Sequence, residues 1–512
     1  MELSGMKHLF PLSVLLLLPL LHGVALAEET TVLSQESLKI TYEELKLPGS
    51  EKMGMLGLGA DHQLTSYLKL GISSYSAVRG ERGGFITLGA SANMTYPLMR
   101  GLELDSGLFV GAGGGHGGYT LSGGGLMVRA HVGANYELGD YGKLGLGVSS
   151  IDFPNGGSIS STQPYFSYTM PFYALTTPGW TESGARYLNS DDEKRLSPAM
   201  HEFAIYFRNV MVDSGTRTNS GGAQADFTLL GAEWRTYLND TVFAKLESEG
   251  AASGQSAGYM HILAGAGVRY PLSRRLFATA TVAAGGGGGG NVDTGGGFLT
   301  DATLGLQYFV AKHLFVDVSG SYLRAPSTSF DAKSIGAKLG YQFSSSGKSD
   351  PTFNEPSRFD PNLLRLRLTS QTYLKSGDNG STRSIDQNVD NLGAQFDYFI
   401  NPGWFVTGQG LAAYGGNAGA YMAGFVGTGY HVSLGKHFFA EIEGVMGVAG
   451  GGGLATGGGA AAQANASFGY SFSDSIALMV TLGEITSIKG QFSAPVVGVS
   501  LAFMGTAYSR NE

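Results

Sequence analysis

The sequence contains no cysteine, which excludes disulfide bonds, thiolate metal sites and a lipid-modified cysteine after an N-terminal leader. Charged residues make up only 14% of the chain, against roughly 25% in an average soluble domain. Much of the surface is therefore expected not to face water. The net charge of −8 argues against nucleic acid as a partner.

Long apolar runs are also absent after the first residues of the chain. Residues 1–27 read as a secretory signal peptide, with Lys7 as the positive charge and an apolar core over 9–21. That core is too short for a membrane helix and is interrupted by Pro11 and Pro19. The small-x-small pattern at 25–27 predicts cleavage before Glu28, so the mature protein is expected to leave the cytoplasm.

Glycine, by contrast, is abundant, with 81 residues. Three glycine-rich stretches occur, at 113–125, 285–297 and 450–459, and a tyrosine follows a matched glycine of each by 13 residues. The matched pairs are Gly123 and Tyr136, Gly295 and Tyr308, and Gly457 and Tyr470. Constant spacing between otherwise different residues predicts one unit repeated three times.

Each unit divides into eight short runs in which apolar and polar residues alternate, as at 364–369 and 314–318. This period of two predicts half-buried antiparallel β-strands. The predicted organisation is a signal peptide at 1–27, β repeats at 38–175, 202–344 and 362–505, a periplasmic linker at 176–201, a second linker at 345–361, and a C-terminal tail at 506–512.

Connections between the predicted strands alternate between tight turns and longer polar loops, such as 213–224 and 376–388. Aromatic residues gather beside the tight turns, and the last strands of repeats two and three end in an aromatic residue, at 336–343 and 498–503. In these features the chain resembles the bacterial outer-membrane β-barrel class, as a tandem of units similar to eight-stranded barrels. The resemblance implies a place in the outer membrane of a Gram-negative bacterium, with outer-membrane lipid as a partner and the linkers in the periplasm.

Two architectures are compatible with three eight-stranded repeats. Small residues predicted to face inward, such as Thr279, Thr281 and Ser319, would leave voids in a narrow barrel. They favour one wide transmembrane up-and-down barrel of about 24 strands. The proline-containing linkers instead favour the alternative of three small barrels.

Strand parity places a set of charged residues on the polar face, where they are predicted to face a wet lumen because charge facing lipid is costly. The candidates are Lys39, Glu103, Asp105, Arg129, His131, Arg208, Asp301, Asp317, Lys338, Arg365, Arg367, Asp397, Glu441 and Glu443. Such a lumen predicts a channel or an export pore. The alternatives are a non-transporting structural or surface-interaction barrel and a secreted, glycine-rich, self-assembling β protein.

The sequence shows no local catalytic or metal-binding motif, and none of its histidines forms a metal-ligand pattern. We predict no enzyme activity, no metal and no cofactor, although an outer-membrane lipase or protease site assembled across strands would leave no such motif.

The glycine-rich hairpins are predicted to be seats for close approach by another backbone, because glycine otherwise weakens a strand. The occupant is expected to be an inward-folded loop or a partner protein. The candidate residues are Gly123, Gly287, Gly289, Gly295, Gly296 and Gly457.

Overall fold

The structure is a computed structural model that describes residues 32–115, 125–180, 186–188, 200–344, 357–374 and 388–509. The predicted signal peptide lies outside the described residues, as does most of the two predicted linkers. Nearly all of the described chain is antiparallel β-strand, with short 3-10 turns at Pro48–Ser50 and Gly139–Tyr141. No helix in these ranges is both long enough and apolar enough to cross a membrane.

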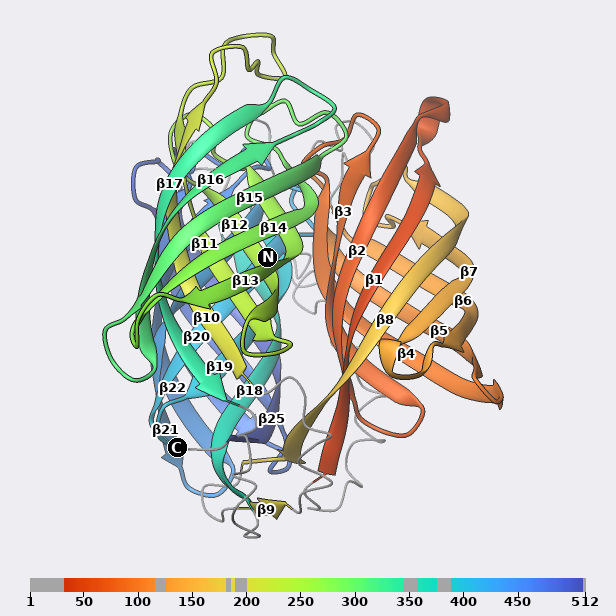
Figure 1. Cartoon of the computed structure of the whole chain (residues 1–512), viewed down its shortest axis with the longest axis vertical. Helices are drawn as coiled ribbons and strands as arrows, with labels where there is room; N and C mark the ends of the chain where they lie inside the picture. The colour runs from red at the N-terminus through yellow and green to blue at the C-terminus, as the bar shows by residue number, and fades with distance from the viewer. Residues whose placement is uncertain are drawn as a thin grey trace, which may run out of the picture.

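The strands form three closed rings of eight, here called barrels 1, 2 and 3 (Figure 1). Barrel 1 contains β1 (Val32–Lys46), β2 (Lys52–Gln63), β3 (Leu68–Arg79), β4 (Ile86–Met99), β5 (Leu102–Gly113), β6 (Met127–Glu137), β7 (Lys143–Asp152) and β8 (Ser160–Pro178). Barrel 2 contains β10 (Met200–Val212), β11 (Phe227–Tyr237), β12 (Val242–Ser253), β13 (Met260–Pro271), β14 (Leu276–Gly288), β15 (Phe298–Phe309), β16 (Leu314–Arg324) and β17 (Asp331–Ser344). Barrel 3 contains β18 (Ser357–Tyr373), β19 (Val389–Phe399), β20 (Trp404–Ala413), β21 (Met422–Leu434), β22 (Phe438–Gly450), β23 (Ala460–Ser471), β24 (Ile476–Ser487) and β25 (Ser493–Ser509).

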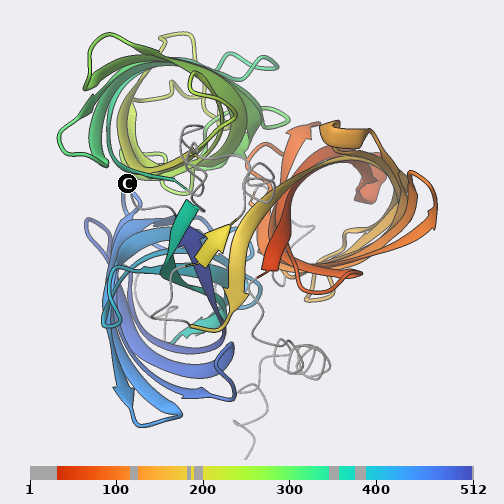
Figure 2. The same cartoon turned by 60° about the horizontal axis from the view of Figure 1, so that its bottom comes forward.

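The favoured expectation of one ring of about 24 strands is wrong. The first strand of each unit pairs with the last strand of the same unit, β1 with β8, β10 with β17 and β18 with β25. Every other ladder within a ring joins strands that are consecutive in the chain. Two short ladders connect different parts of the chain, between β18 and β9 (Arg186–Leu188) and between the ends of β8 and β25. The alternative of three small barrels is therefore the architecture found, and Figure 2 shows the three rings lying side by side at the corners of a triangle.

Small inward residues do not leave voids because large side chains from neighbouring strands lie over them. A methyl group added at Gly57 would be 2.5 Å from the Tyr75 ring, and one at Gly340 would be 2.2 Å from the Phe315 ring. Each glycine thus makes room for an aromatic ring inside a narrow barrel, where the interior must be filled by side chains. Small inward residues therefore do not by themselves indicate a wide barrel, because side chains from neighbouring strands can fill the space over them.

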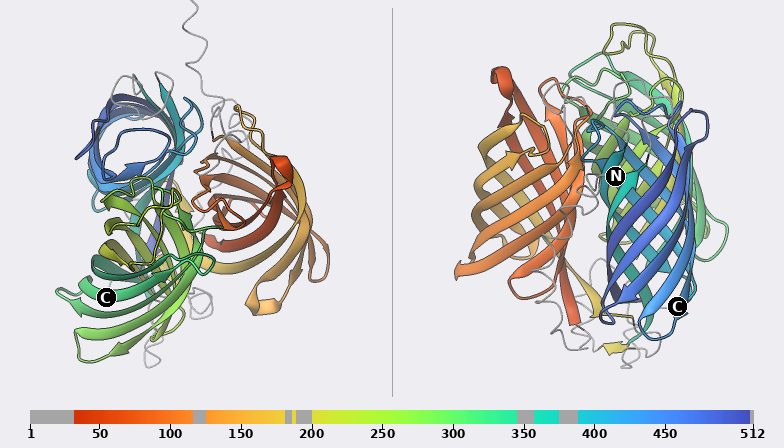
Figure 3. Two further views of the ribbon diagram at one scale, coloured as in Figure 1. Left: turned by 90° about the horizontal axis from the view of Figure 1, so that it is seen from above. Right: turned by 180° about the vertical axis from the view of Figure 1, so that it is seen from behind.

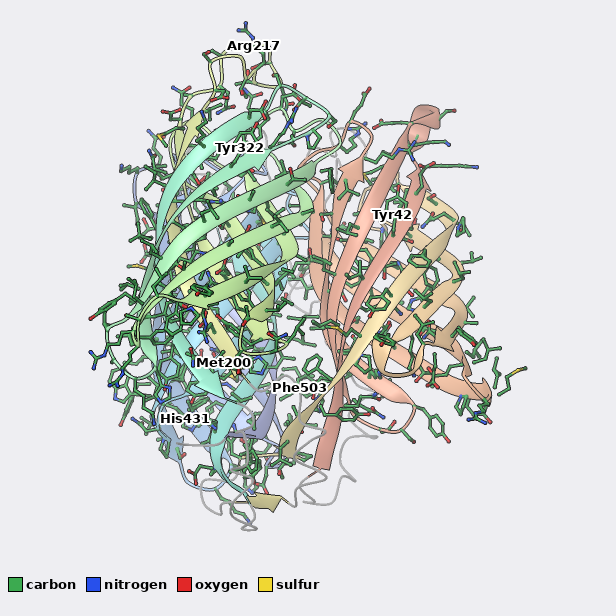
Figure 4. All side chains as sticks on the ribbon, in the orientation of Figure 1. Tyr42, Met200, Arg217, Tyr322, His431 and Phe503 are labelled. Atoms are coloured by element: carbon green, nitrogen blue, oxygen red, sulfur yellow. The ribbon has the colours of Figure 1, made fainter. Side chains whose placement is uncertain are left out.

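The two ends of the barrels differ, as the alternation of tight turns and longer loops predicts. Tight turns at 238–241, 272–275 and 310–313 lie at one end of barrel 2, and the loops at 213–226 and 289–297 lie at the other. The same division holds in barrels 1 and 3, so we call these the short-turn end and the long-loop end. Met200 pairs with Tyr237 and Ser344, which places both termini of barrel 2 at the short-turn end. In Figure 4, Arg217 marks the long-loop end and His431 lies toward the opposite end.

Candidate functional sites: the barrel interiors and the glycine hairpins

The interior of barrel 2 holds a continuous network of buried ion pairs. Arg208 is fully buried and lies 2.7 Å from Glu249 and 2.8 Å from Asp301. On the short-turn side of this group, Glu233 contacts Lys338 at 2.8 Å and Arg235 at 2.7 Å. Alternation of inward and outward residues along β10, β11 and β12 brings these groups together, since each strand directs every second side chain inward.

Barrel 3 contains a smaller network built from the strand pair β18–β19 and from β22, which lies across the interior from that pair. Arg365 and Arg367 on β18 share the carboxylate of Asp397, each at 2.7 Å. Arg365 also contacts Glu441 at 2.5 Å, and Arg367 contacts Glu443 at 2.8 Å. Because each guanidinium group contacts two carboxylates, the charges are paired within the barrel.

The interior of barrel 1 holds ion pairs and a small polar cavity. Lys39 contacts Asp105 at 2.9 Å, and Arg129 contacts Glu43 at 2.8 Å. Between these pairs lies a polar cavity of about 20 Å³, lined in part by Lys39, Asp61 and Arg129. A cavity of this size holds about one water molecule.

All of the charged residues predicted to face a lumen lie inside a barrel and have a charged partner there. Their partners include Glu43, Lys143, Glu233, Arg235 and Glu249, which the sequence analysis did not select. The period-two pattern Lys245-x-Glu247-x-Glu249 on β12 could have identified Glu249. The structure therefore replaces a wet lumen with packed, paired charge.

Apolar clusters close the long-loop end of every barrel interior. In barrel 1 the cluster includes Met53, Phe85 and Phe153, which are nearly fully buried. The corresponding cluster of barrel 2 includes Phe227, Leu299 and Phe330, and that of barrel 3 includes Tyr373, Tyr421 and Phe492. Burial raises the pKa of Tyr421, in the loop before β21, well above its ordinary value. We call these clusters the apolar caps.

The short-turn mouths of the three barrels differ in chemistry. The mouth of barrel 1 is charged, with Lys143 2.6 Å from Glu103 and 3.2 Å from Glu137. The mouth of barrel 2 is filled by its own aromatic rings, with Phe309 packed against Phe315 at 5.6 Å between ring centroids. The mouth of barrel 1 thus has polar, partly exposed side chains, whereas the mouth of barrel 2 has apolar ones.

The glycine hairpin of barrel 2 lies against barrel 1 at the long-loop end. The Gly83 amide donates a hydrogen bond of 2.7 Å to the Gly295 carbonyl across this contact. A methyl group added at Gly286 would be 2.3 Å from the Ser76 hydroxyl, and one at Gly296 would be 2.8 Å from Arg79. Side chains at these positions would therefore hold the two barrels apart.

Equivalent contacts join the other two pairs of barrels, so the arrangement is cyclic (Figure 3). The hairpin of barrel 3 meets barrel 2, where a methyl group on Gly450 would be 2.3 Å from the Gly258 nitrogen. Barrel 1 meets barrel 3, where a methyl group on Gly410 would be 2.7 Å from Leu88. We call these three contacts the glycine seats. In each seat, strand five of one barrel faces strand three of the next, and adjacent strands add further contacts.

Some of the predicted glycine candidates lie in the seat between barrels 1 and 2, and the others lie elsewhere. Gly296 lies directly in the seat between barrels 1 and 2, and Gly295 contributes its carbonyl. Gly289 also lies in this seat, since a methyl group added at Gly84 of barrel 1 would be 2.3 Å from the Gly289 nitrogen. Gly287 packs inside its own barrel against His261, and an added carbon at Gly457 would meet the backbone of its own barrel. Gly123 lies outside the described residues. The sequence analysis missed Gly286 and Gly450, whose outward parity at the strand end is the signal that would have found them.

One group of side chains in barrel 2 has the residue types of a metal site. Ligand atoms of Glu247, Glu249 and His261 lie within 4.8 Å of one another. The Arg208 guanidinium already occupies this group, 2.7 Å from Glu249 and 3.1 Å from the Nε2 atom of His261. A fixed cation at that position opposes a second one, so the geometry does not favour a metal. The absence of a metal or cofactor stays a prediction.

No protein-family model matches the chain, and no curated protein matches it. Among solved structures, a designed transmembrane β-barrel is 15% identical and aligns with 28% of this chain and 94% of its own, with a TM-score of 0.19. The ferric enterobactin receptor is 10% identical over 93% of this chain and 82% of its own, with a TM-score of 0.27. The siderophore receptor PirA from Pseudomonas aeruginosa is 9% identical over 93% and 81%, also with a TM-score of 0.27.

The geometry of the chain itself confirms the class-level resemblance to outer-membrane β-barrels. The barrels are closed, antiparallel and eight-stranded, with a mainly apolar outer face. Exposed charged side chains such as Arg79 and Arg324 lie at strand ends. Outward residues in the middle of the strands include Leu146, Leu304 and Ile442, whose exposed fractions are 66%, 71% and 65%. A surface of this kind is the one that a transmembrane barrel presents to lipid.

Proposed function

We propose that this protein is a bacterial outer-membrane protein whose three barrels anchor it without conducting, and that it has a structural or surface-interaction role. The observation that supports the proposal is the presence of an apolar cap and a paired charge network in every barrel. A conducting channel needs a continuous polar path, and the caps interrupt that path in all three interiors. An export pore would need a still wider interior than eight strands provide.

The outer faces support membrane insertion over secretion as a self-assembling β protein. Exposed tyrosines lie beside the tight turns, among them Tyr96, Tyr136 and Tyr270. Amphipathic rings of this kind are enriched at the level of lipid headgroups. With the tight turns in the periplasm, as is usual for this class, the long-loop end of all three barrels faces outward as one joint surface.

Two measurements test the proposal. Membrane fractionation with heat-dependent gel migration is expected to find the folded chain in the outer membrane, and recovery as a soluble or fibrous protein would refute the anchor. In planar lipid bilayers the purified protein is expected to give no conductance steps, whereas a general porin inserted under the same conditions gives them. Reproducible steps from the full chain would instead support the channel.

A further inference from the structure

The last strand of barrel 1 continues beyond its own barrel and joins barrel 3. Thr177 and Pro178 at the end of β8 pair with Thr506 and Gly505 on β25. The contact continues at Gly179, whose amide donates a 3.0 Å hydrogen bond to the Met504 carbonyl. The Thr506 hydroxyl donates a 2.8 Å hydrogen bond back to the Gly179 carbonyl. Barrels that are not consecutive in the chain are therefore connected by main-chain hydrogen bonds.

The residue after this junction, Trp180, enters the short-turn mouth of barrel 3. Its indole N–H donates a 3.0 Å hydrogen bond to the Leu364 carbonyl. Its ring packs edge-on against Phe399, at 4.5 Å between centroids, and against His431, at 5.4 Å. It also contacts the buried clusters that contain Phe405 and Met504. A side chain of the inter-barrel segment thus completes the interior of another barrel.

Barrel 3 has room for the indole because two positions that are aromatic in barrel 2 are small. Phe309 pairs with Phe315 at the first turn between β15 and β16. The same place between β23 and β24 holds Ser471 paired with Ala477. The two phenyl rings that fill the mouth of barrel 2 are therefore missing in barrel 3, and the volume is taken by Trp180.

Two further positions at the mouth also hold less polar side chains in barrel 3 than in barrel 2. Gln342 in barrel 2 pairs with Glu202, whereas the matching position in barrel 3 is Met504 paired with Arg365. Arg269, which stacks over Tyr237 and Phe277 in barrel 2, corresponds to His431 in barrel 3. An apolar thioether and an aromatic ring accept an indole better than a primary amide and a guanidinium group that need polar partners of their own.

We propose that Trp180 is a built-in stopper, which closes the mouth of barrel 3 and locks barrel 1 onto it. The lock acts between barrels 1 and 3, which are not consecutive in the sequence. At the long-loop end this pair has a glycine seat, and at the short-turn end it has Trp180 and the β8–β25 junction. Release of the stopper exposes the Arg365 network to water and frees barrel 1 to move relative to barrel 3.

Tryptophan fluorescence tests where the indole lies. The chain has three tryptophans, and Trp234 and Trp404 are exposed on the outer face, at 38% and 49%. The double variant Trp234→Phe/Trp404→Phe leaves Trp180 alone in the full-length protein in lipid vesicles. Its emission is expected to resist both acrylamide in the water and brominated lipid in the bilayer. Quenching by acrylamide as strong as that of free tryptophan would overturn the proposal.

A filling variant tests the pocket. In the single-tryptophan protein, Ala477→Phe restores one ring of the barrel 2 mouth and is expected to expel the indole, so that acrylamide quenching rises severalfold. The matched control is Ala466→Phe, at an exposed outward position of β23, which is expected to leave quenching unchanged. Equal quenching in the two variants would show that the indole does not occupy this pocket.

A cross-link tests the lock independently of Ala477. Thr176 pairs with Ala507, so Thr176→Cys/Ala507→Cys in this cysteine-free chain should form one disulfide between barrels 1 and 3. Adding Trp180→Ala is expected to lower the yield of that disulfide severalfold, while Trp180→Phe retains most of it. An unchanged yield with Trp180→Ala would refute the lock.

Discussion

At the scale of single residues, the unusual feature is the amount of charge buried in interiors that face lipid on the outside. A buried ion pair gives little net stability when compared with apolar packing, because both ions lose their hydration. Removing one partner is much more costly, since it leaves an unpaired buried charge. In barrels 2 and 3 a guanidinium group contacts two carboxylates, so the loss of one arginine would leave two carboxylates without that partner.

We therefore expect Arg208→Met to lower the free energy of unfolding of barrel 2 by about 3–5 kcal/mol, because Glu249 and Asp301 lose their cation. The matched control is Arg217→Met in the exposed loop after β10, for which a change within about 0.5 kcal/mol is expected. Urea titration in lipid vesicles, followed by heat-dependent gel migration, measures both. Equal midpoints for the two variants would contradict the role given to the network.

At the scale of strands, outward parity decides whether a glycine touches a neighbouring barrel. Gly286 on β14 and Gly444 on β22 both point outward, but only Gly286 lies in a seat. An added methyl group at Gly444 would meet nothing within 4 Å, whereas at Gly286 it would meet Ser76. The same residue type thus has opposite consequences on equivalent strands.

Gly286→Val is expected to separate barrels 1 and 2 at the long-loop end while both barrels stay folded, because the clash lies between them. Gly444→Val is the control and is expected to leave the arrangement unchanged. Spin labels on Lys52→Cys and Ser220→Cys, measured by pulsed electron resonance, report the distance between the two loop faces. A distance distribution that broadens equally in both variants, or in neither, would show that the seat does not hold the barrels together.

At the scale of the whole molecule, each barrel closes its own ladders, and the barrels differ in how they close their mouths. All hydrogen-bonded ladders of barrel 2 lie within residues 200–344. Barrel 3 also closes its ring, but part of its interior is supplied by Trp180 from the segment after barrel 1. Barrel 2 therefore depends less on residues outside its own ring than barrel 3 does.

A fragment of residues 200–344 is expected to fold alone in detergent micelles with the heat-dependent migration of a closed barrel. A fragment of residues 357–509 is expected to fold with a free energy of unfolding about 3 kcal/mol lower than that of barrel 3 in the full chain, since it lacks a large buried aromatic group. Urea midpoints of fragment and full chain provide the comparison. If the second fragment matched the full chain, the mouth of barrel 3 would not depend on Trp180.

Local features of this fold could be predicted from the sequence because strand parity is a local property. Alternation placed Asp317 inside and Val316 outside, as the structure has them. The number of rings could not be predicted in the same way. Whether β1 pairs with β8 or with β25 depends on contacts far apart in the chain, and on how Tyr75 and Phe315 fill the space over small neighbours. Trp180 was missed because it stands in a proline-containing segment with no alternation to assign it a direction.

The covalent connection of the three barrels has a further consequence for the glycine seats. Tethered partners meet at an effective concentration of the order of millimolar, so a contact too weak to hold separate molecules can hold segments of one chain. Because the barrels are tethered, seats made of glycine backbones can hold them together although these seats bury few apolar side chains. The tether also fixes a stoichiometry of one copy of each barrel in one cyclic order, which allows three mouths of different chemistry to occupy assigned places in a single assembly.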